Sequence, residues 1–419
     1  MTSSRIAGFH NLSREARLNA LVTRGLLSAA EAAELGLEAA TAGALADNLS
    51  ENVISVMAVP LGVATNLTVD GVDVLVPMAT EESSVIAAMS NGARACRASG
   101  GVSTEADAPC MIAQVQITGL SELTAAKAAV EAREGEIAEV CNACDPMLVK
   151  LGGGFRALEV RICGPFLVVH LIIDVRDAMG ANAVNTMAEA LAPKLERWSG
   201  GTVGLRILSN LADRRLVRAR AVWRAEEIGA QMVQGIVSAS EFAAHDPYRA
   251  ATHNKGIMNG ISAVALATGN DTRALEAGAH AFAATRGQGA GYGPLSRYGQ
   301  TAEGDLWGEI ELPMAVGIVG GATRAHPTAQ KALKIMRVRS ADRLARVVAA
   351  VGLIQNFSAL RALAGEGIQR GHMGLHARNV AIVAGATGPE IERVAKAMIA
   401  RREIREDVAR AILAQGSAG

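Results

Sequence analysis

The stretch from about Ala108 to Asp213 constrains the fold more than any other part of the chain. Runs with strand and helix patterning alternate in the order strand, helix, strand, strand, helix, strand. The runs are "PCMIAQVQITGL", a charged helix from Ser121 to about Val149, two strands in "FRALEVRICGPFLVVHLIIDV" around Gly164-Pro165, the helix "ANAVNTMAEALAPKLERW" and the strand "GTVGLRILSN". This βαββαβ order is typical of the split, ferredoxin-like unit, which closes into a compact module. We therefore expect an insert that interrupts a domain formed by the chain on either side.

The flanking chain has the patterning of a mixed α/β domain. Helix formers fill the first fifty residues, and "ISVMAVPLGVATNLTVDGVDVLVPM" predicts two strands joined by a tight turn at Asp70-Gly71. Helices, a Gly-rich loop and a hairpin-like segment follow the insert, and the last fifty residues predict a small helical appendage that moves as a unit. The predicted fold is α+β. Its expected parts are residues 1–107 and 214–368 as the large domain, 108–213 as the insert and 369–419 as a C-terminal helical flap.

Composition excludes several classes of function. Hydrophobic residues make up 50% of the 419 residues and charged residues 20%, so a large buried core is available. Because 41 basic residues balance 41 acidic ones and only 3% are aromatic, we expect no nucleic-acid partner. Apolar runs such as "FLVVHLII" are shorter than the ~18 residues that span a bilayer. With no signal-peptide core and five cysteines, the expectation is a cytoplasmic protein with reduced thiols and no membrane partner.

Two spacings could suggest a metal site, and neither is complete. "CNAC" at 141–144 has no second cysteine pair, and His372 and His376, four residues apart, have no carboxylate close by in sequence. The sequence also lacks GxGxxG after a strand, a Walker loop, HExxH and GxSxG. We therefore expect no metal.

Glu81 and Glu82 stand immediately before an apolar helix and allow two interpretations. Acidic residues at a helix N-terminus complement the helix dipole, which is the commoner arrangement and the one that spacing alone favours. The alternative is a carboxylic acid kept protonated by burial that donates a proton during a reaction.

The segment "DPYRAATHNKGIMNG" (246–260) gathers several polar and cationic side chains before an apolar run. It is either a solvated loop or a cationic site held at a helix terminus. Lys255 lies beside Gly256, where a ligand can approach the backbone closely, but it could equally be an ordinary surface lysine. Asp271 follows the apolar run, so a lysine and an aspartate at the two ends of one buried helix could form an internal pair or polarise a carbonyl.

The segment "IIDVRDAMGANAVNTM" places a glycine where a strand passes into a helix. Such a turn leaves backbone N–H groups free to bind an anion such as a pyrophosphate, although this is a weak signal alone. "KLGGGFR" (150–156) is compatible with a hairpin turn or a linker.

Together these segments resemble a known family. The motifs that carry the resemblance span nearly the whole chain and are "ENVISVMAVPLGVATNL", "EE" at 81–82, "DVRDAMGANAVNTMAE", "RILSNLAD", "DPYRAATHNKGIMNG", "TGND", "PMAVGIVGGAT" and "GIQRGHMGLHARN". They are similar to the bacterial class II 3-hydroxy-3-methylglutaryl-coenzyme A (HMG-CoA) reductases. The resemblance implies a four-electron interconversion of HMG-CoA with mevalonate and CoA, through mevaldyl-CoA and mevaldehyde.

The resemblance also assigns the catalytic residues. Lys255 matches the lysine that stabilises the oxyanion, and Glu82 matches the glutamate that protonates oxygen. Asp271 matches the aspartate that pairs with the lysine, and His372 matches the histidine that protonates the departing thiolate. His376 is the less suitable histidine.

Binding residues follow in the same way. For the substrate, Arg249 matches the arginine that holds the carboxylate, with Ser84 and Asn259 as polar neighbours. For the dinucleotide, the motif "DAMGAN" at 177–182 supplies Asp177, Met179, Gly180 and Asn182. Asp145 occupies the place of an aspartate that faces the adenosine ribose. Because a carboxylate accepts a hydrogen bond from a 2′-hydroxyl and repels a 2′-phosphate, NADH is expected rather than NADPH.

The resemblance further implies a homodimer whose active site lies at the subunit interface, with one subunit's insert serving the other's large domain. Two alternatives stay open at this point. The chain could be a catalytically idle oligomer of the same fold that binds a nucleotide or acyl-CoA, or an enzyme that works in the direction of mevalonate oxidation.

Overall fold

A computed structural model of the chain describes residues 6, 8–41, 45–286, 291–365 and 368–416, with the backbone alone at 41, 322, 368–373, 375 and 416. It divides into two compact units. One comprises Met1–Pro60 with Ala325–Pro327, and the other Leu61–Arg324 with Thr328–Gly419. The smaller unit is helical, with η1 (Phe9–Asn11), α1 (Arg14–Thr23), α2 (Ala29–Thr41) and α3 (Leu45–Leu49).

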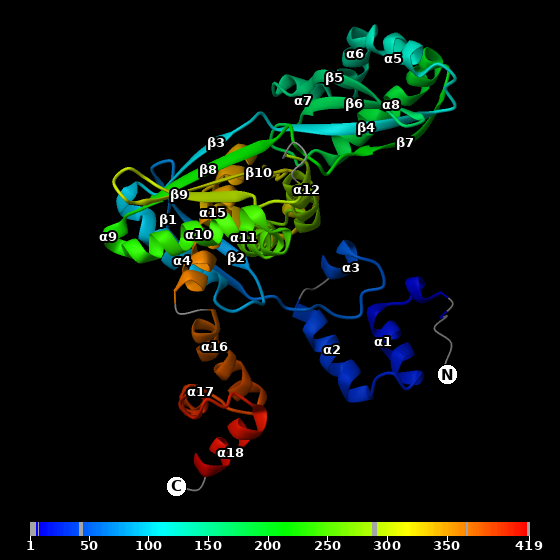
Figure 1. Cartoon of the computed structure of the whole chain (residues 1–419). Helices are drawn as coiled ribbons and strands as arrows, with labels where there is room; N and C mark the ends of the chain where they lie inside the picture. Colours follow the sequence, from blue (N-terminus) through cyan, green and yellow to red (C-terminus); the bar gives the residue numbers. More distant parts are fainter. Residues whose placement is uncertain (1–5, 7, 42–44, 287–290, 366–367, 417–419) are drawn as a thin grey trace. The chain divides into compact units, whose positions relative to one another are not determined.

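The predicted insert is a four-stranded antiparallel sheet covered by helices (Figure 1). Its strands are β4 (Cys110–Thr118), β5 (Gly154–Cys163), β6 (Phe166–Asp174) and β7 (Thr202–Leu208). The spatial order β5-β6-β4-β7 is the order of a ferredoxin-like fold, so the α+β class with a ferredoxin-like insert is confirmed. Helix α8 (Ala181–Ser199) packs against β4 and β7, and it buries an apolar stripe that includes Val184 and Leu191.

The single helix predicted from Ser121 to about Val149 is wrong. The chain forms three helices there, α5 (Leu123–Glu131), α6 (Glu134–Cys144) and α7 (Pro146–Lys150). The second break has a local cause, because Pro146 lacks an N–H and occupies the first position of α7. Asp145 caps the new helix by accepting a hydrogen bond from the backbone of Leu148.

The large domain contains a six-stranded sheet with the order β2-β1-β3-β8-β10-β9. Its strands are β1 (Leu61–Val69), β2 (Val72–Ala79), β3 (Val102–Ala106), β8 (Leu216–Trp223), β9 (Ser296–Gln300) and β10 (Leu306–Pro313). The turn predicted between β1 and β2 is confirmed: Asp70 and Gly71 both have positive φ, 52° and 75°, as a tight hairpin turn requires. The insert lies between β3 and β8, which pair directly, so the sheet continues across the interruption.

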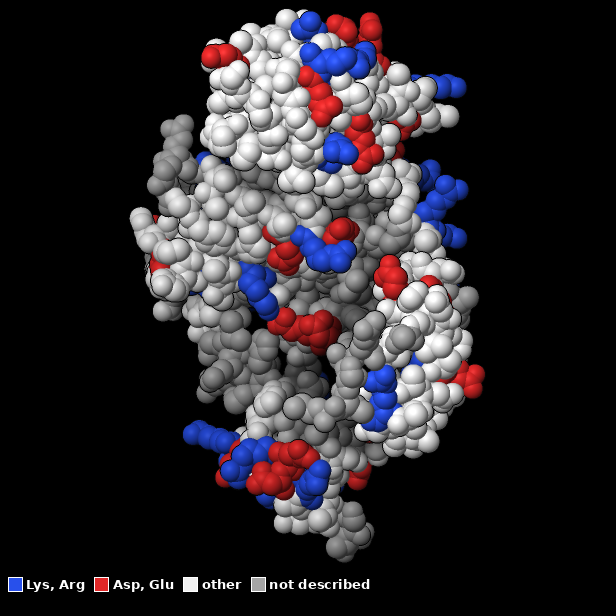
Figure 2. Space-filling model, turned by 90° about the vertical axis from the view of Figure 1, so that its right-hand side faces the viewer, with Lys and Arg blue, Asp and Glu red and all other residues white. Residues whose placement is uncertain are grey.

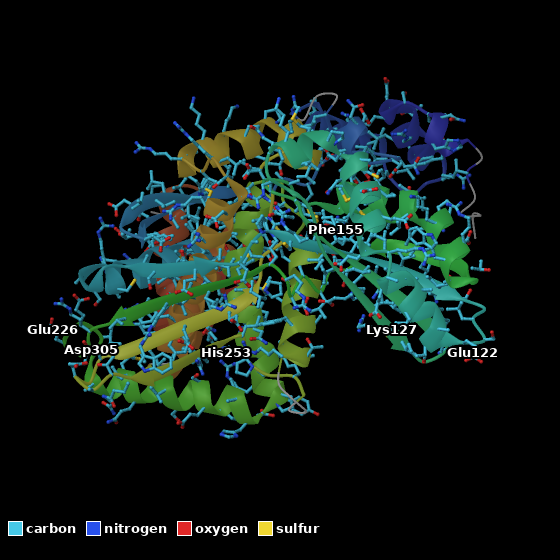
Figure 3. The ribbon with its side chains drawn as sticks, turned by 90° about the horizontal axis from the view of Figure 1, so that it is seen from above. Glu122, Lys127, Phe155, Glu226, His253 and Asp305 are labelled. Atoms are coloured by element: carbon cyan, nitrogen blue, oxygen red, sulfur yellow. The ribbon has the colours of Figure 1, made fainter. Side chains whose placement is uncertain are left out.

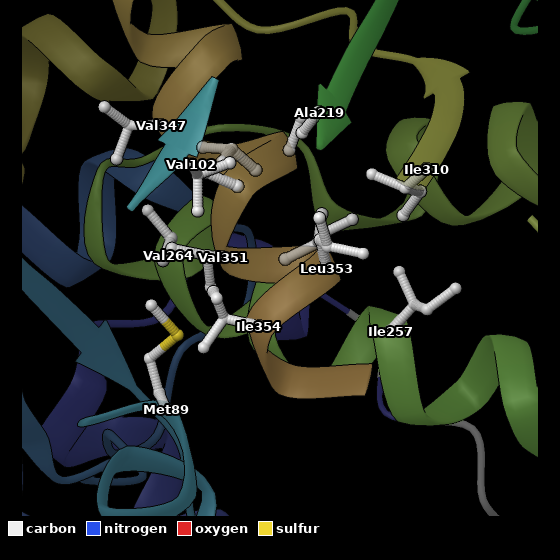
Figure 4. Close-up of a cluster of buried hydrophobic side chains, with 14 of the residues drawn as sticks. Met89, Val102, Ala219, Ile257, Val264, Ile310, Val347, Val351, Leu353 and Ile354 are labelled. Atoms are coloured by element: carbon white, nitrogen blue, oxygen red, sulfur yellow. The ribbon is translucent and has the colours of Figure 1, made fainter. Parts of the chain in front are cut away.

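Helices cover one face of this sheet, and α15 (Ala341–Ala364) lies at the centre of the core. The large domain also contains α4 (Val85–Cys96), η2 (Arg97–Ser99), α9 (Ala225–Ile228), α10 (Ala230–His245), α11 (Pro247–Ala267) and α12 (Thr272–Thr285). Two further helices, α13 (Gly321–Ala325) and α14 (Pro327–Met336), precede α15 in the chain. Figure 4 shows Val351 and Ile354 of α15 packed among side chains of α4, α11 and the sheet. Helix α15 is long and apolar enough to cross a membrane, but 67% of its apolar window is buried inside the protein, as in a core helix.

The C-terminal segment forms three helices, α16 (Ile368–Val383), α17 (Pro389–Arg401) and α18 (Glu406–Gly416). They enclose an apolar cluster of their own that includes Ala381, Val394 and Met398. Such a separate core is what a helical flap requires. The domain boundaries expected at 107, 213 and 368 stay predictions. On the face drawn in Figure 2, side chains of both charge signs are interspersed.

Candidate active site

Lys255 and Glu82 meet although they are 173 residues apart in sequence. The ammonium Nζ of Lys255 donates a hydrogen bond to Oε2 of Glu82 at 3.1 Å. Both side chains reach solvent, with 61% and 39% of their surfaces exposed, so a substrate can approach them. The contact forms because α11 packs against β2, and Glu82 stands three residues after the end of β2. A cation and a carboxyl group are thus brought together at one accessible point.

The segment "DPYRAATHNKGIMNG" is helical, so the interpretation as a solvated loop is wrong. Asp246 caps α11 by accepting hydrogen bonds from the backbone of Tyr248 and Arg249, and Pro247 begins the helix. The face that carries Ile257 and Gly260 is buried. Lys255 and Asn259, one turn apart on the other side, face away from the core. The helix therefore holds the catalytic lysine candidate on a rigid support.

Glu82 belongs to a strained turn. Ser84 has φ 77°, a left-handed conformation that is uncommon for residues other than glycine. It stands at the N-cap of α4 without a side-chain capping bond, so its hydroxyl is not used to hold the helix. Strain of this kind concentrates at functional sites. Within the same turn the backbone N–H of Glu82 donates to Thr80 Oγ1 at 3.1 Å.

Arg249 lies six residues before Lys255 on the same helix and is half-buried. Burial lowers the pKa of its guanidinium. Among the described residues no acceptor is recorded for that group, whereas most other half-buried arginines of the domain have one. An unpaired guanidinium at a half-buried position is suited to a ligand carboxylate.

Asp271 does not reach Lys255 within one chain. It caps α12, accepting hydrogen bonds from the backbone of Arg273 and Ala274, and it pairs with the Arg273 side chain. From Lys255 to the end of α11 at Ala267 the helix rises about 18 Å, at about 1.5 Å per residue. Desolvation raises the pKa of Asp271, but the hydrogen bonds from Ala274 and Arg273 outweigh it and hold the pKa below its usual value. The carboxylate is therefore anionic and lies at the far end of the helix.

The predicted catalytic histidine lies outside the described side chains. His372 lies within the span of α16, but its side chain is not among those described. His376 on the same helix is exposed. In the described part of the protein no three His, Cys, Asp or Glu side chains gather as a metal site would require.

The expected dinucleotide motif forms the turn between β6 and α8. Gly180 has φ 107° and stands at the N-cap of α8, where it offers no side chain to the first-turn N–H groups. Asn182 is exposed in that first turn, and Met179 is half-buried. The uncapped helix terminus fits an anionic group such as a pyrophosphate. The Asp177 side chain binds the protein itself: its Oδ1 accepts a hydrogen bond from the backbone N–H of Ala341 at 2.7 Å.

Asp145 lies at the junction of α6 and α7 rather than inside one helix. Its Oδ1 accepts from the backbone N–H of Leu148 at 2.9 Å, and its side chain is half-buried. The following "LGGG" turn joins α7 to β5, so the segment is a linker and the interpretation as a hairpin turn is wrong. Asp145 therefore has a structural role as a helix cap, and its expected role toward a ribose stays a prediction.

Three residues that connect these parts were not singled out from the sequence. Arg215 donates to the carbonyls of the 177–180 turn, Gly317 packs against Met179, and Asn270 accepts a hydrogen bond from Gly317 N at 2.8 Å. The motifs "RILSNLAD" and "PMAVGIVGGAT" mark their neighbourhood, but no pattern in them predicts these contacts.

Comparison with known proteins agrees with this geometry. The family model described as hydroxymethylglutaryl-coenzyme A reductase matches residues 13–377. A 3-hydroxy-3-methylglutaryl-coenzyme A reductase of Archaeoglobus fulgidus is 55% identical over 416 residues, covering 98% of this chain and 94% of the relative. A probable reductase of the same name from Borreliella burgdorferi is 36% identical, covering 80% and 77%.

Solved structures match over the same extent. The 3-hydroxy-3-methylglutaryl-coenzyme A reductase of Streptococcus pneumoniae has a TM-score of 0.75 and 39% identity, and the match covers 98% of this chain and 99% of that one. A second structure of the S. pneumoniae enzyme, described as class II and bound to NADPH in open conformations, has a TM-score of 0.75 and 39% identity, covering 96% and 99%. This chain therefore belongs to the hydroxymethylglutaryl-coenzyme A reductase family of oxidoreductases, and within it to class II.

Proposed function

We propose that this protein interconverts HMG-CoA with mevalonate and CoA, using NADH as the reductant. The observation that carries the proposal is the 3.1 Å contact between Lys255 Nζ and Glu82 Oε2 at an accessible point of the large domain. Reduction of a thioester places negative charge on its carbonyl oxygen, which a nearby cation stabilises and a nearby acid protonates. Lys255 and Glu82 supply these two groups together.

The remaining roles follow from position on the same framework. Arg249 holds the carboxylate of the substrate, and Ser84 and Asn259 supply polar contacts beside Glu82 and Lys255. His372, on the C-terminal helical segment, protonates the CoA thiolate as it leaves. The bound dinucleotide supplies hydride, and the protein's task is to orient it and to exclude water from the reacting carbon.

The dinucleotide is proposed to bind at the 177–182 turn. Gly180 at the N-cap leaves the first-turn N–H groups of α8 to the pyrophosphate. Asp177 shapes the turn from within, Met179 and Asn182 flank it, and Asp145 faces the adenosine ribose. A relative 39% identical is described as bound to NADPH. We propose NADH for this chain because the Asp145 carboxylate repels a 2′-phosphate.

Asp271 is proposed to act in the active site of a second copy of the chain. Within one chain it lies at the end of α11 remote from Lys255, and its recorded side-chain partner is Arg273. A two-fold dimer that brings the α12 N-terminus of one subunit to the Lys255 of the other would complete the catalytic set at both sites. The 177–182 turn and Asp271 would then come from the same subunit.

The test is turnover of purified protein in both directions. HMG-CoA should oxidise two molecules of NADH for each CoA thiol released, followed by nicotinamide absorbance and a thiol reagent. Mevalonate with CoA should reduce NAD in the same ratio. Initial rates with NADPH give the cofactor preference. Absence of turnover with either cofactor in both directions would refute the enzymatic assignment and favour a binding protein of the same fold.

A further inference from the structure

Arg215 is a buried cation that the proposed chemistry does not use. It precedes β8 and is only 3% exposed. Its main chain is fixed in the large domain, because its N–H donates to Ala212 O at 3.0 Å and its carbonyl accepts from Met314 N at 3.0 Å. Burial lowers the pKa of its guanidinium to about 10. A charge at such a position is costly unless hydrogen bonds satisfy it.

The Arg215 guanidinium binds only main-chain carbonyls. Nη1 donates to Ala178 O at 3.2 Å and to Met179 O at 3.3 Å, and Nη2 donates to Val316 O at 2.6 Å. No carboxylate is recorded in contact with it among the described residues. A planar guanidinium presents several donors in a fixed arrangement, so it defines the relative positions of the carbonyls that it binds. Here those carbonyls belong to two separate segments of the chain.

The first segment is the turn that is proposed to bind the dinucleotide. Met179 is followed by Gly180, the N-cap of α8, so a hydrogen bond to Met179 O restrains the peptide plane between them. The N–H of Gly180 lies in that plane, and the first-turn N–H groups follow it. A small rotation there would turn these donors away from a bound pyrophosphate.

The second segment connects this turn with Asp271. Ile318 N donates to Asp177 O at 2.9 Å, and Gly317 packs so closely that a Cβ on it would lie 2.4 Å from Met179 N. Gly317 N in turn donates to Asn270 Oδ1 at 2.8 Å, beside Asp271. The chain of contacts runs from Arg215 through residues 316–318 to the catalytic aspartate candidate.

We propose that Arg215 is a positioning residue that sets the 177–180 turn against residues 316–318, and thereby aligns the dinucleotide with Asp271. This inference rests on the proposed function, since it presumes a dinucleotide at that turn. Loss of the guanidinium should weaken NADH binding while leaving the affinity for HMG-CoA, which depends on Arg249, nearly unchanged.

The test uses full-length protein and direct titration with NADH, followed by the fluorescence of the bound nicotinamide. Arg215→Met should raise the Kd for NADH at least tenfold and leave the KM for HMG-CoA within twofold of wild type. Arg215→Lys keeps the positive charge but lacks the planar guanidinium with its several donors. Its Kd for NADH should therefore lie between that of wild type and that of Arg215→Met. Arg220→Met is the matched control: Arg220 is on β8 and its exposed guanidinium stacks over Trp307, and the Kd should not change.

Gly317→Ala tests the contact between residues 316–318 and the 177–180 turn without changing Arg215. It leaves the hydrogen bonds of the Arg215 guanidinium in place and adds only a methyl group. Its Cβ pushes on the Met179 N–H and should raise the Kd for NADH selectively, even if Arg215→Met does not fold. A wild-type Kd in Gly317→Ala would overturn the inference, as would equal losses of NADH and HMG-CoA affinity in both variants. If the wild-type protein neither binds nor oxidises NADH, that result refutes the proposed function, on which this inference rests.

Discussion

His253 Nε2 lies 2.6 Å from Ser296 Oγ, and the surrounding hydrogen bonds determine which atom carries the proton. Asn356 donates from Nδ2 to His253 O, so its Oδ1 is the acceptor for both Ser296 and Tyr298. The Ser296 hydroxyl proton is therefore used, and His253 must donate from Nε2. His253, which lies inside the large domain in Figure 3, thus joins α11 to β9 two residues before Lys255.

Asn356→Ala should reduce the free energy of unfolding by about 2–4 kcal/mol, because it removes three buried hydrogen bonds, to His253 O, to the Ser296 hydroxyl and to the Tyr298 hydroxyl. The exposed Asn91 on α4 gives a matched control, and Asn91→Ala should change stability by no more than about 0.5 kcal/mol. Urea unfolding followed by circular dichroism measures both. Equal free energies of unfolding for the two variants would mean that the hydrogen bonds of Asn356 do not stabilise the position of α11.

His253 should also make stability depend on pH. Burial, with a smaller contribution from the Arg249 charge, lowers the pKa of His253 to about 3. The folded protein keeps the imidazole neutral, whereas the unfolded chain binds a proton below its ordinary pKa of about 6.5. Stability from this group is therefore complete above about pH 6.5 and falls as pH decreases toward 3, by at most about 1.4 kcal/mol per pH unit. In His253→Gln the midpoint of urea unfolding should depend less on pH over this range. If the midpoint changes with pH as steeply as in wild type, His253 is not the group responsible.

The parts of the fold that sequence patterns predicted correctly are those with local causes. Asp70-Gly71 forms the predicted hairpin turn because both residues tolerate positive φ. The topology of the insert was predicted correctly from the order of strands and helices in 108–213, because few compact arrangements are compatible with that order. The long helix predicted from Ser121 failed because strong helix formers concealed a local signal, the Asp145 cap followed by Pro146.

The site was less predictable, because its contacts join distant segments. A glutamate before a helix and a lysine on another helix have no pattern in common, and only the resemblance brought Glu82 and Lys255 together in advance. The expected pairing of Lys255 with Asp271 does not form within a chain, because about 18 Å of α11 separates Lys255 from the end of the helix that precedes Asp271. Arg215 follows the motif "RILSNLAD" by two residues, but no pattern could predict its partners, because they are main-chain carbonyl groups, which every residue has.

Lys255→Ala should lower kcat by about 100- to 1,000-fold, the usual cost of removing one group that stabilises an oxyanion. Lys127, a half-buried lysine of the insert labelled in Figure 3, pairs with Glu131 one turn away and serves as the control. Lys127→Ala should keep wild-type kcat. Steady-state oxidation of NADH with saturating HMG-CoA measures both variants, and near-normal turnover of Lys255→Ala would remove the lysine from the chemistry.

Asp145→Ser should shift the preference from NADH toward NADPH. Serine retains a helix-capping oxygen for Leu148 N, so the variant removes the charge while keeping the start of α7. The ratio of kcat/KM for NADH to that for NADPH should fall about tenfold, which corresponds to about 1.4 kcal/mol of relieved repulsion. Glu122→Gln removes an equal charge elsewhere in the insert and should leave the ratio unchanged. An unaltered ratio in Asp145→Ser would exclude this carboxylate from cofactor choice.

The placement of Asp271 predicts that two inactive subunits can restore each other. Lys255→Ala and Asp271→Asn are each expected to be nearly inactive, and asparagine keeps the cap of α12. In a heterodimer of the two, one site lacks both residues and the other has both, if Asp271 acts across the interface. Heterodimers purified through two different affinity tags should then show about half the wild-type activity, from one of two sites.

Glu82 provides the control for this experiment, because it contacts Lys255 within the same chain. A heterodimer of Lys255→Ala with Glu82→Gln has one damaged residue in each site and should stay inactive. Rescue by Asp271→Asn but not by Glu82→Gln would show that the site combines Glu82 and Lys255 of one subunit with Asp271 of the other. Heterodimers that fail to exceed the parent variants in both cases would place Asp271 in the same site as its own Lys255, and a rearrangement at the end of α11 would then be required for catalysis.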